Sequence, residues 1–315
     1  MTTVPFAPHP TTEGFVTRFA PSPNGDLHLG HVLSAITGHE MARRRDGRFL
    51  VRIEDIDVAR TREAHVASIL DDLAWIGLTW EQPVLRQSHH FRDYAEAARR
   101  LRHMGLLYPC FATRGEIIQA VAAEVARGRG WTSDPDGAPL YPGLSRAIGA
   151  DEAAERIRLG EPHAWRLDME KALVECRRRL SGEPLTFVEI DAEGREAVVP
   201  ACPERWGDAV IVRKDIPASY HLAVVIDDAR QGVTVVTRGR DLYAATDLHR
   251  LLQVLLGLAE PRYHHHRLLL GADGRKLSKS AGSMSLRSLR QGGMTAAEVC
   301  QEIGIERLGV TGLRR

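Results

Sequence analysis

The strongest constraint on the fold is an alternation of short apolar runs with amphipathic stretches, which is interrupted once and then resumes. Apolar runs at 15–20 and 48–53 predict buried strands, and the stretches at about 27–45, 60–76 and 91–104 have the apolar spacing of helices. A rhythm of strand, helix, strand, helix is typical of a parallel sheet with helices on both faces. The sequence therefore predicts an α/β fold with a doubly wound, Rossmann-like parallel sheet.

The rhythm breaks between about 109 and 200. There a loop rich in Gly, Pro and Asp precedes a short helix near 151–159 and strand-like runs at 164–167 and 185–190. We interpret this stretch as an inserted α+β domain.

The pattern then resumes, and the expected elements are strands at 209–212, 221–226 and 233–237 and a helix at about 247–256. A loop and a short C-terminal helical region close the chain. The expected divisions are 15–108 and 201–260 as the two halves of one core, 109–200 as the insertion, and 261–315 as the loop with the closing helical region.

Composition limits the cellular compartment and the classes of partner that the protein can have. A chain of 315 residues with 43% hydrophobic content can bury a sizeable core. A net charge of +1 gives no argument for a nucleic-acid binder, so any RNA contact must be a local patch, and we expect no DNA partner. The 4 Cys are scattered, as in reducing compartments. No apolar leader or long apolar span is present, so we expect a cytoplasmic monomer without a membrane partner.

The first chemical pattern is His28-Leu29-Gly30-His31, which follows the first strand and a Pro/Gly turn at the start of a helix. Two imidazoles three residues apart share one helical face, and the helix N-terminus offers N–H groups and positive partial charge to a phosphate. Gly30 would let a flat ring approach the backbone. The pattern predicts a site for the triphosphate and nucleoside of ATP, although two surface histidines near a turn would give the same letters.

The second pattern is the run Lys276-Leu277-Ser278-Lys279 in a loop led by glycines. Two ammonium groups at this spacing can hold the β- and γ-phosphates and neutralise the charge of departing pyrophosphate. A Lys/Ser loop is commonly just solvated. Here, however, Lys occurs only at positions 171, 214, 276 and 279, so half of the lysines fall in this loop of an Arg-rich chain. Since a compact ammonium is not equivalent to Arg at a phosphate, this placement favours phosphate binding.

In this order, the two patterns resemble the HIGH and KMSKS signatures of class I aminoacyl-tRNA synthetases, in particular the glutamyl branch. The resemblance runs from about 17 to 285, and its supporting stretches are 18–23, 52–55, 218–223 and 237–242. Leu277 stands where Met is usual, a volume-conserving change. The resemblance implies a ligase with an acceptor-binding-like insertion and ATP with Mg²⁺ as co-substrate. The residues that it assigns to ATP and catalysis are His28, Gly30, His31, Lys276, Ser278 and Lys279.

A glutamate site can be argued from chemistry as well. A dicarboxylic amino acid needs a bidentate cation for a carboxylate and an anion for its ammonium group. Arg18 and Arg238 are expected at strand ends, where doubly wound sheets bind ligands. The acidic turn after the second strand could also cap the next helix, which we expect of Asp57 and not of Glu54. The positions that match glutamate contacts of the family are Arg18, Phe19, Ala20, Pro21, Ser22, Glu54, Tyr220 and Arg238.

Within the branch, the chain resembles the short members, the glutamyl-Q tRNA(Asp) synthetases. It ends soon after the Lys loop, so we expect no helical anticodon-binding domain, and the stretches 208–213 and 224–228 are also similar to those members. The resemblance implies tRNA-independent activation of L-glutamate and its transfer to the queuosine base in the anticodon region of tRNA(Asp).

The short members often carry a zinc site in the insertion, and the matching positions here are Cys110, Ala112, Tyr141 and Ser145. One thiolate and one phenol are too few for a structural zinc, which takes four ligands, so we expect this site to be degenerate and no metal to bind. The run 264–266 is His-rich, but neighbouring residues of a strand point in opposite directions and are not expected to share an ion.

Three alternatives stay open. One is a truncated glutamyl-tRNA synthetase-type enzyme that charges a tRNA 3′ end. Another is a catalytically silent regulatory paralogue, against which the intact His and Lys patterns argue. The third is a phosphopantetheine-type nucleotidylyltransferase, which shares the helix pattern but is much shorter and would not need the glutamate set. Pyrophosphate exchange with each amino acid in the absence of tRNA would separate the glutamate-activating enzyme from the last two.

Overall fold

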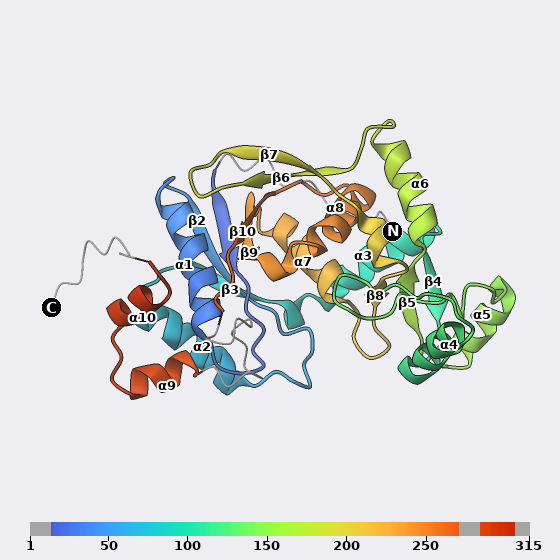
Figure 1. Ribbon diagram of the computed structural model, residues 1–315, viewed down its shortest axis with the longest axis horizontal. Coiled ribbons are helices and arrows are strands. Elements are labelled where there is room, and N and C mark those ends of the chain that lie inside the picture. Colours follow the sequence, from blue (N-terminus) through green and yellow to red (C-terminus); the bar gives the residue numbers. More distant parts are fainter. Residues whose placement is uncertain (1–13, 271–283, 306–315) are drawn as a thin grey trace.

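The computed structural model describes residues 14–270 and 284–305, and its centre is a layer of parallel strands (Figure 1). The first part of this layer is a sheet in the order β1-β2-β3, with both pairings parallel. Its strands are β1 (Val16–Phe19), β2 (Arg48–Ile53) and β3 (Glu81–Arg86). The predicted strands at 15–20 and 48–53 are thus confirmed, whereas β3 was missed because Pro83 and its polar neighbours do not form an apolar run.

The second part of the layer is a sheet in the order β7-β6-β10-β9, parallel except for the β6–β7 pair. Its strands are β6 (Thr186–Ile190), β7 (Glu196–Pro200), β9 (Val235–Gly239) and β10 (Arg262–His266). β9 lies beside β1, and Thr234 N donates to Val16 O at 3.0 Å. The chain therefore places β2 and β3 on one side of β1 and β9 and β10 on the other. Doubly wound folds bind ligands at the carboxyl ends of the strands at such a reversal.

Helices cover both faces of the layer. One apolar core joins β1 and β2 to helices on one face: α1 (Leu29–Arg43), α2 (Glu63–Trp75), α9 (Leu286–Gln291) and α10 (Ala296–Glu302). A second core lies among the helices of the other face: α3 (Phe91–His103), α6 (Met169–Arg179), α7 (Tyr220–Arg230) and α8 (Ala245–Leu256). Short 3₁₀ turns follow β3, β7 and β9 at Gln87–His89, Pro203–Trp206 and Arg240–Leu242.

Strand alternation decides which side chains reach each face. In β1, Thr17 bonds the backbone of α1 through Oγ1, whereas Arg18 points to the opposite face and bonds Asp228 of α7. The same period of two directs Arg52 of β2 and Arg238 of β9 to the face that α7 and α8 cover. Three arginines from separate strands therefore share one side of the layer.

A separate antiparallel sheet has the order β4-β5-β8, and of its strands only β5 lies wholly within the stretch expected as an insertion. Its strands are β4 (Leu107–Cys110), β5 (Ala164–Leu167) and β8 (Val210–Val212). Two helices lie beside this sheet in Figure 1, α4 (Arg114–Ala126) and α5 (Ala150–Arg158). The predicted strand at 164–167 and the helix near 151–159 are confirmed, and α4 and α6 were missed.

One expected element of the resumed pattern is wrong, and another is confirmed as a strand but belongs to a different sheet. The run 221–226, expected as a strand, is part of helix α7, and Ser219 caps it by accepting a hydrogen bond from Leu222 N at 3.4 Å. Because every residue from Leu222 to Asp228 is buried, the run shows no helical polar face and reads like a strand. The strand at 209–212 exists as β8 but pairs antiparallel with β5 of the insertion and not within the parallel layer.

β6, in contrast, lies in the parallel layer beside β10, although its residues fall within the stretch assigned to the insertion. The division of the chain at 109, 201 and 261 stays a prediction.

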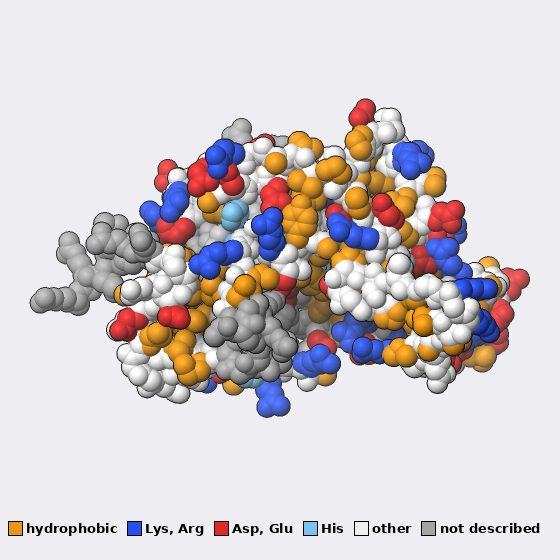
Figure 2. All heavy atoms as spheres, in the orientation of Figure 1, with side chains coloured by type: hydrophobic (Ala, Val, Ile, Leu, Met, Phe, Trp, Pro, Cys, Tyr) orange, Lys and Arg blue, Asp and Glu red, His pale blue; other side chains and the backbone are white. Residues whose placement is uncertain are grey.

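The charged side chains on the surface are mixed in sign, as the near-neutral composition leads us to expect. Figure 2 shows Lys and Arg side chains interspersed with Asp and Glu over the face that it presents, in keeping with the net charge of +1. Among residues 14–270 and 284–305, no helix is both long and apolar enough to cross a membrane.

Candidate active site

A cavity of about 430 Å³ lies at the carboxyl ends of β1 and β9. Its wall contains each described residue that the sequence assigned to ATP or glutamate: Arg18, Phe19, Ala20, Pro21, Ser22, His28, Gly30, His31, Glu54, Tyr220 and Arg238. Lys276, Ser278 and Lys279 lie outside the described residues. The fold thus brings together in one cavity residues that lie far apart in sequence, such as Arg18 and Arg238.

The His28–His31 pattern forms the N-terminal cap of α1. The Nδ1 atom of His28 accepts from Gly30 N at 3.1 Å, and His28 N donates to Nδ1 of His31 at 3.2 Å, which completes a reciprocal capping box. The two rings stack with centroids 3.7 Å apart. Because both Nδ1 atoms accept, each neutral ring carries its proton on Nε2, a donor suited to a phosphate or ribose oxygen.

The structure gives a reason for glycine at position 30 that differs from the expected approach of a ligand ring. A Cβ at this position would lie 3.0 Å from Cε1 of His28, so the glycine makes room for the ring of its own cap. The approach of a flat ligand ring to Gly30 stays a prediction.

The described residues on either side of the Lys loop lie at this cavity. Leu268 and Leu269 line it, and on the other side Ser285 forms a β-bridge with His28. Leu286 N also donates to Leu27 O at 2.7 Å. Leu269 therefore lies at the cavity and Ser285 at the helix cap, while the Lys pattern between them falls outside the described residues.

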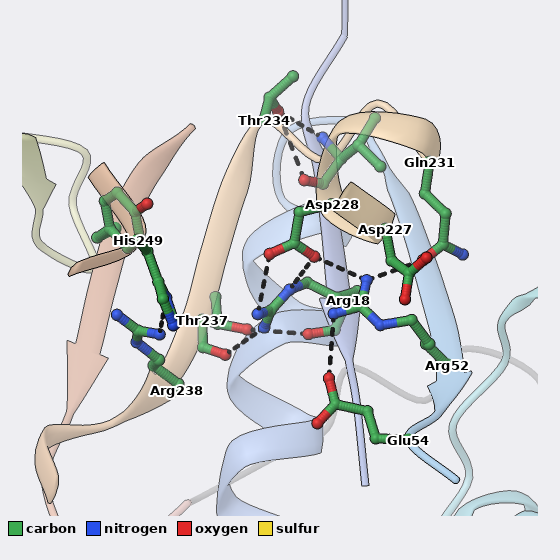
Figure 3. A network of polar contacts seen from close by, with 12 residues as sticks. Arg18, Arg52, Glu54, Asp227, Asp228, Gln231, Thr234, Thr237, Arg238 and His249 are labelled. Carbon is green, nitrogen blue, oxygen red and sulfur yellow. Dashed lines mark hydrogen bonds and ion pairs between the residues drawn. The ribbon is translucent and has the colours of Figure 1, made fainter. Parts of the chain in front are cut away.

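A buried ionic network includes two residues of the cavity wall, Arg18 and Glu54, and extends behind it (Figure 3). Asp228 of α7 accepts from Arg18 Nε at 2.9 Å and from Arg52 Nη1 at 2.7 Å. Arg52, which is fully buried, also contacts Glu54 at 3.3 Å and Gln231 at 3.0 Å. The network fixes Arg18 and Glu54 relative to each other at the end of neighbouring strands.

Burial and ion pairing act in opposite directions on these carboxyl groups. Burial alone would raise the pKa of Asp228, but the adjacent Arg18 and Arg52 outweigh it and hold that pKa below its ordinary value. For Glu54, burial is the largest influence and raises its pKa, although the charges of Arg52, at 3.3 Å, and of Arg18 act to lower it. The arginines thus stabilise the ionised form of Asp228. The ionised form of Glu54, which lines the cavity, is stabilised less by its surroundings.

Arg238 differs from the other two arginines. Its guanidinium donates to His265 Nε2 at 3.2 Å, to His249 Nδ1 at 3.1 Å and to Thr246 Oγ1 at 2.6 Å. Within the part of the chain that the structure describes, no carboxylate lies at ion-pair distance from it. A cation that is 4% exposed and has only neutral partners is well placed to receive an anionic ligand.

Tyr220 opens helix α7 at the cavity wall. Its ring packs against those of His221 and His249, with centroids 5.4 and 5.6 Å away. Burial raises the pKa of its phenol, which therefore stays protonated at neutral pH and can donate a hydrogen bond to a ligand.

Sequence reasoning missed the residues behind the cavity wall. Asp228, Thr246, His249 and His265 had no assigned role, yet they contact the site arginines. One signal was available: an acidic pair ends the apolar run of 222–226, and a charge in a buried segment needs a partner.

The expected cap at Asp57 is wrong. Helix α2 begins at Glu63 after Arg62, which makes no side-chain cap, and Asp57 lies in the preceding turn near Arg60 and Arg213.

The four positions of the expected degenerate zinc site lie in the insertion. Ser145 N donates to the Tyr141 hydroxyl at 2.7 Å, and Phe111 N donates to Ser145 Oγ at 3.3 Å. Burial and a hydrogen bond with Cys110 raise the pKa of Tyr141 to about 12. Hydrogen bonds thus connect three of the four positions directly.

Comparison with known proteins places this geometry in a family. Residues 15–313 match the family model described as tRNA synthetases class I (E and Q), catalytic domain. The chain is 43% identical over 291 residues to a glutamyl-Q tRNA(Asp) synthetase of Rhodobacter capsulatus, an alignment that covers 92% of this chain and 100% of that protein. A protein of the same name from Nocardia farcinica is 38% identical, with 91% and 83% covered.

Solved structures give the same fold. A glutamate-tRNA synthetase from Elizabethkingia anophelis superposes with a TM-score of 0.67 and 27% identity, over 86% of this chain and 53% of that one. The chain therefore spans about half the length of that synthetase. The family match, the relatives and the cavity at the strand ends agree, and the chain belongs to the class I tRNA synthetases of the E and Q type, as an enzyme of the ligase class.

Proposed function

We propose that this enzyme activates L-glutamate with ATP, without tRNA, and transfers it to the queuosine base of tRNA(Asp). The observation that carries the amino-acid part is Arg238, a buried cation with neutral protein partners, in the same cavity as the cap of α1. The names of the relatives from Rhodobacter capsulatus and Nocardia farcinica support the acceptor.

The charges of the cavity complement those of glutamate. Arg18 and Arg52 are balanced by Asp228 and Glu54, so Arg238 supplies one net positive charge for the side-chain carboxylate. Glu54 faces the ammonium group, and the Tyr220 hydroxyl donates to the bound amino acid. Backbone groups near Ala20 and the hydroxyl of Ser22 complete the contacts.

The proposed binding of ATP involves residues of the cavity wall at the start of α1. The N-terminus of α1 and the Nε2 donors of His28 and His31 bind the phosphate and ribose region, next to Gly30. Lys276 and Lys279, with Ser278, hold the departing pyrophosphate. Their assignment is supported by the sequence pattern, by Leu269 in the cavity wall and by the β-bridge of Ser285 with His28. ATP enters as its magnesium complex, in which the metal is part of the substrate.

The reaction needs positioning and charge stabilisation and no side-chain nucleophile. An oxygen of the glutamate α-carboxylate attacks the α-phosphorus in line, the bond to the β-phosphate oxygen breaks, and pyrophosphate leaves. A hydroxyl of the queuosine ring then attacks the glutamyl carbonyl carbon, AMP departs, and the hydroxyl proton is released to solvent.

Two measurements test the proposal. Pyrophosphate exchange without tRNA should proceed with glutamate and not with other amino acids. Labelled glutamate should then pass to queuosine-bearing tRNA(Asp) that lacks its 3′-terminal adenosine. Exchange that strictly requires tRNA, or transfer only to an intact 3′ end, would indicate a truncated glutamyl-tRNA synthetase-type enzyme. No exchange with any amino acid would indicate a silent regulatory paralogue.

A further inference from the structure

The neutral partners of Arg238 form a specific hydrogen-bonded arrangement. Arg238 Nε, Nη1 and Nη2 face His265, His249 and Thr246, from β10 and α8. The Tyr263 ring lies below, with its centroid 5.3 Å from the guanidinium carbon. We call His249, His265 and Thr246 the neutral cradle. Every guanidinium nitrogen is therefore held by an uncharged acceptor.

The protons of the cradle follow from the chemistry of Arg. A guanidinium can only donate, so the facing nitrogens, His249 Nδ1 and His265 Nε2, must be unprotonated. The proton of His249 then lies on Nε2, which faces His221 Nδ1 at 3.1 Å. The proton of His265 lies on Nδ1, which faces Glu189 Oε1 at 3.3 Å. The carboxylate of Glu189 is thus separated from Arg238 by a whole imidazole ring.

Among the described residues, the two neighbouring arginines, unlike Arg238, have a carboxylate counterion. Arg18 and Arg52 each bind Asp228, whereas Figure 3 shows Arg238 directed at His249, apart from the Asp228 cluster. All three arginines are buried. An aspartate in place of one cradle residue would neutralise Arg238 in the same way as Asp228 neutralises Arg18.

We infer that His249 and His265 are positioning residues that orient Arg238 and keep its charge uncompensated, so that the pocket accepts a side-chain carboxylate and rejects the isosteric amide of glutamine. This inference rests on the proposed activation of glutamate and assigns the specificity of that site to residues behind it. Glutamine would leave the buried charge of Arg238 without a counterion, which is costly where water is excluded.

Burial and the charge of Arg238 keep the two imidazoles of the neutral cradle uncharged. Burial lowers the pKa of His249 well below its ordinary value, and the charge of Arg238 lowers it further. The same two causes, in the same order, lower the pKa of His265 and of His221. Neutral imidazoles are thus the stable form at physiological pH.

The test compares His249→Asn with His249→Asp, two side chains of equal shape that differ in charge. The Asn carbonyl can still accept from Arg238, whereas Asp brings a counterion. The readouts are KM and kcat for glutamate and for glutamine in pyrophosphate exchange without tRNA, KM for ATP, and the melting temperature of each variant.

Relative to His249→Asn, the Asp variant should raise the glutamate KM by about tenfold or more, the scale of one charged hydrogen bond. The ratio of kcat/KM for glutamate to that for glutamine should fall by a similar factor. Equal ratios in the two variants would overturn the inference, because a purely structural role would weaken both amino acids alike. If His249→Asp does not fold, Thr246→Asp and Thr246→Asn make the same comparison at Nη2.

The outcome is separable from that of the proposed function. A wild-type enzyme that exchanges with glutamate while the Asp and Asn variants keep equal ratios contradicts only the role of the cradle. A wild-type enzyme that shows no exchange with glutamate contradicts both.

Discussion

At the level of single residues, the three buried arginines of the site differ in the partners that their guanidinium groups contact. Arg18 and Arg52 share Asp228, so their charges serve to hold β1, β2 and α7 in register. Arg238 has no such partner among the described residues, so in the proposed function its charge is available to the carboxylate of glutamate. The identity of the partner, and not of the arginine, separates a structural cation from a binding one.

Removing Arg238 should therefore weaken glutamate selectively. Arg238→Ala is expected to cost roughly 2–5 kcal/mol of glutamate binding, an increase of about thirtyfold or more in its KM, with little change for ATP. Pyrophosphate exchange at varied glutamate and ATP concentrations measures both. Arg262→Ala, an exposed arginine of β10, is the matched control. Unchanged glutamate KM with weakened ATP would show that the two ligands are placed the wrong way round.

Lys279 belongs to the same scale, although it lies outside the described residues. Lys279→Ala should lower the rate of adenylate formation by about two orders of magnitude, because one group that stabilises the leaving pyrophosphate is lost. Binding of ATP and glutamate should persist. Single-turnover adenylate formation measures the rate, and Lys214→Ala, whose ammonium group contacts Phe111 O in the insertion, is the control. A wild-type rate in Lys279→Ala would contradict its role.

At the scale of elements, helix α1 approaches the sheet at Gly38. A Cβ there would lie 2.8 Å from Thr237 Oγ1 and 3.2 Å from the Phe49 ring, and Gly38 O accepts from Thr17 Oγ1 at 2.8 Å. The missing side chain thus sets the distance between the helix that His28 caps and the three strands that carry the arginines.

Two glycine substitutions should have opposite effects. Gly38→Ala should destabilise the fold by about 1–3 kcal/mol, because the sheet cannot yield to the added methyl group. Gly115→Ala, on the exposed start of α4 where only Thr113 Oγ1 lies near, at 3.9 Å, should stabilise by up to about 1 kcal/mol through helix propensity. Urea unfolding measures both. A stabilising Gly38→Ala would mean that α1 does not pack against β9 as described.

The insertion gives a second prediction at this scale, about metal. Because the Tyr141 hydroxyl and Ser145 Oγ accept backbone hydrogen bonds, its folding should not depend on zinc. Purified protein should hold zinc far below stoichiometry. Treatment with EDTA, followed by its removal and addition of Mg²⁺, should leave the melting temperature and glutamate activation unchanged. Stoichiometric zinc that is lost together with stability would show that Cys110 and Tyr141 have recruited further ligands.

At the scale of the whole molecule, Asp228 joins segments that are far apart in sequence. Its partners Arg18 and Arg52 lie 210 and 176 positions away, so one carboxylate ties the first half of the parallel layer to a helix of the second. Such a buried group is strongly destabilising to remove alone, since its cations lose their counterion.

Asp228→Asn should accordingly cost about 3–5 kcal/mol of folding stability at neutral pH, whereas Asp191→Asn, an exposed partner of Arg195, should change it little. The pKa of Asp228 is lowered in the folded state, so its contribution is present above the unfolded pKa of about 3.9 and is lost as pH falls through the folded value. Urea unfolding from pH 7 to pH 3 should show the difference between wild type and Asp228→Asn shrinking at the acid end. A constant difference would contradict the ionic role.

The sequence alone was enough to predict the parallel strands β1, β2 and β9, the helices α1, α2, α3, α5 and α8, and the end of the sheet at which the cavity lies. Each depends on a local pattern: a period of two or 3.6, a turn, or a capped helix start such as His28. It also selected eleven cavity residues correctly as neighbours, through resemblance and spacing.

Only the tertiary structure decided that 221–226 is a helix, that β6 lies in the parallel layer, and that Arg18 and Arg238 have opposite electrostatic environments. A fully buried helix and a buried strand have the same apolar pattern, so the surrounding layers choose between them. The partner of a buried charge is likewise fixed by packing between distant segments. The residues next to the charge in sequence do not show which distant side chain will lie against it in the fold.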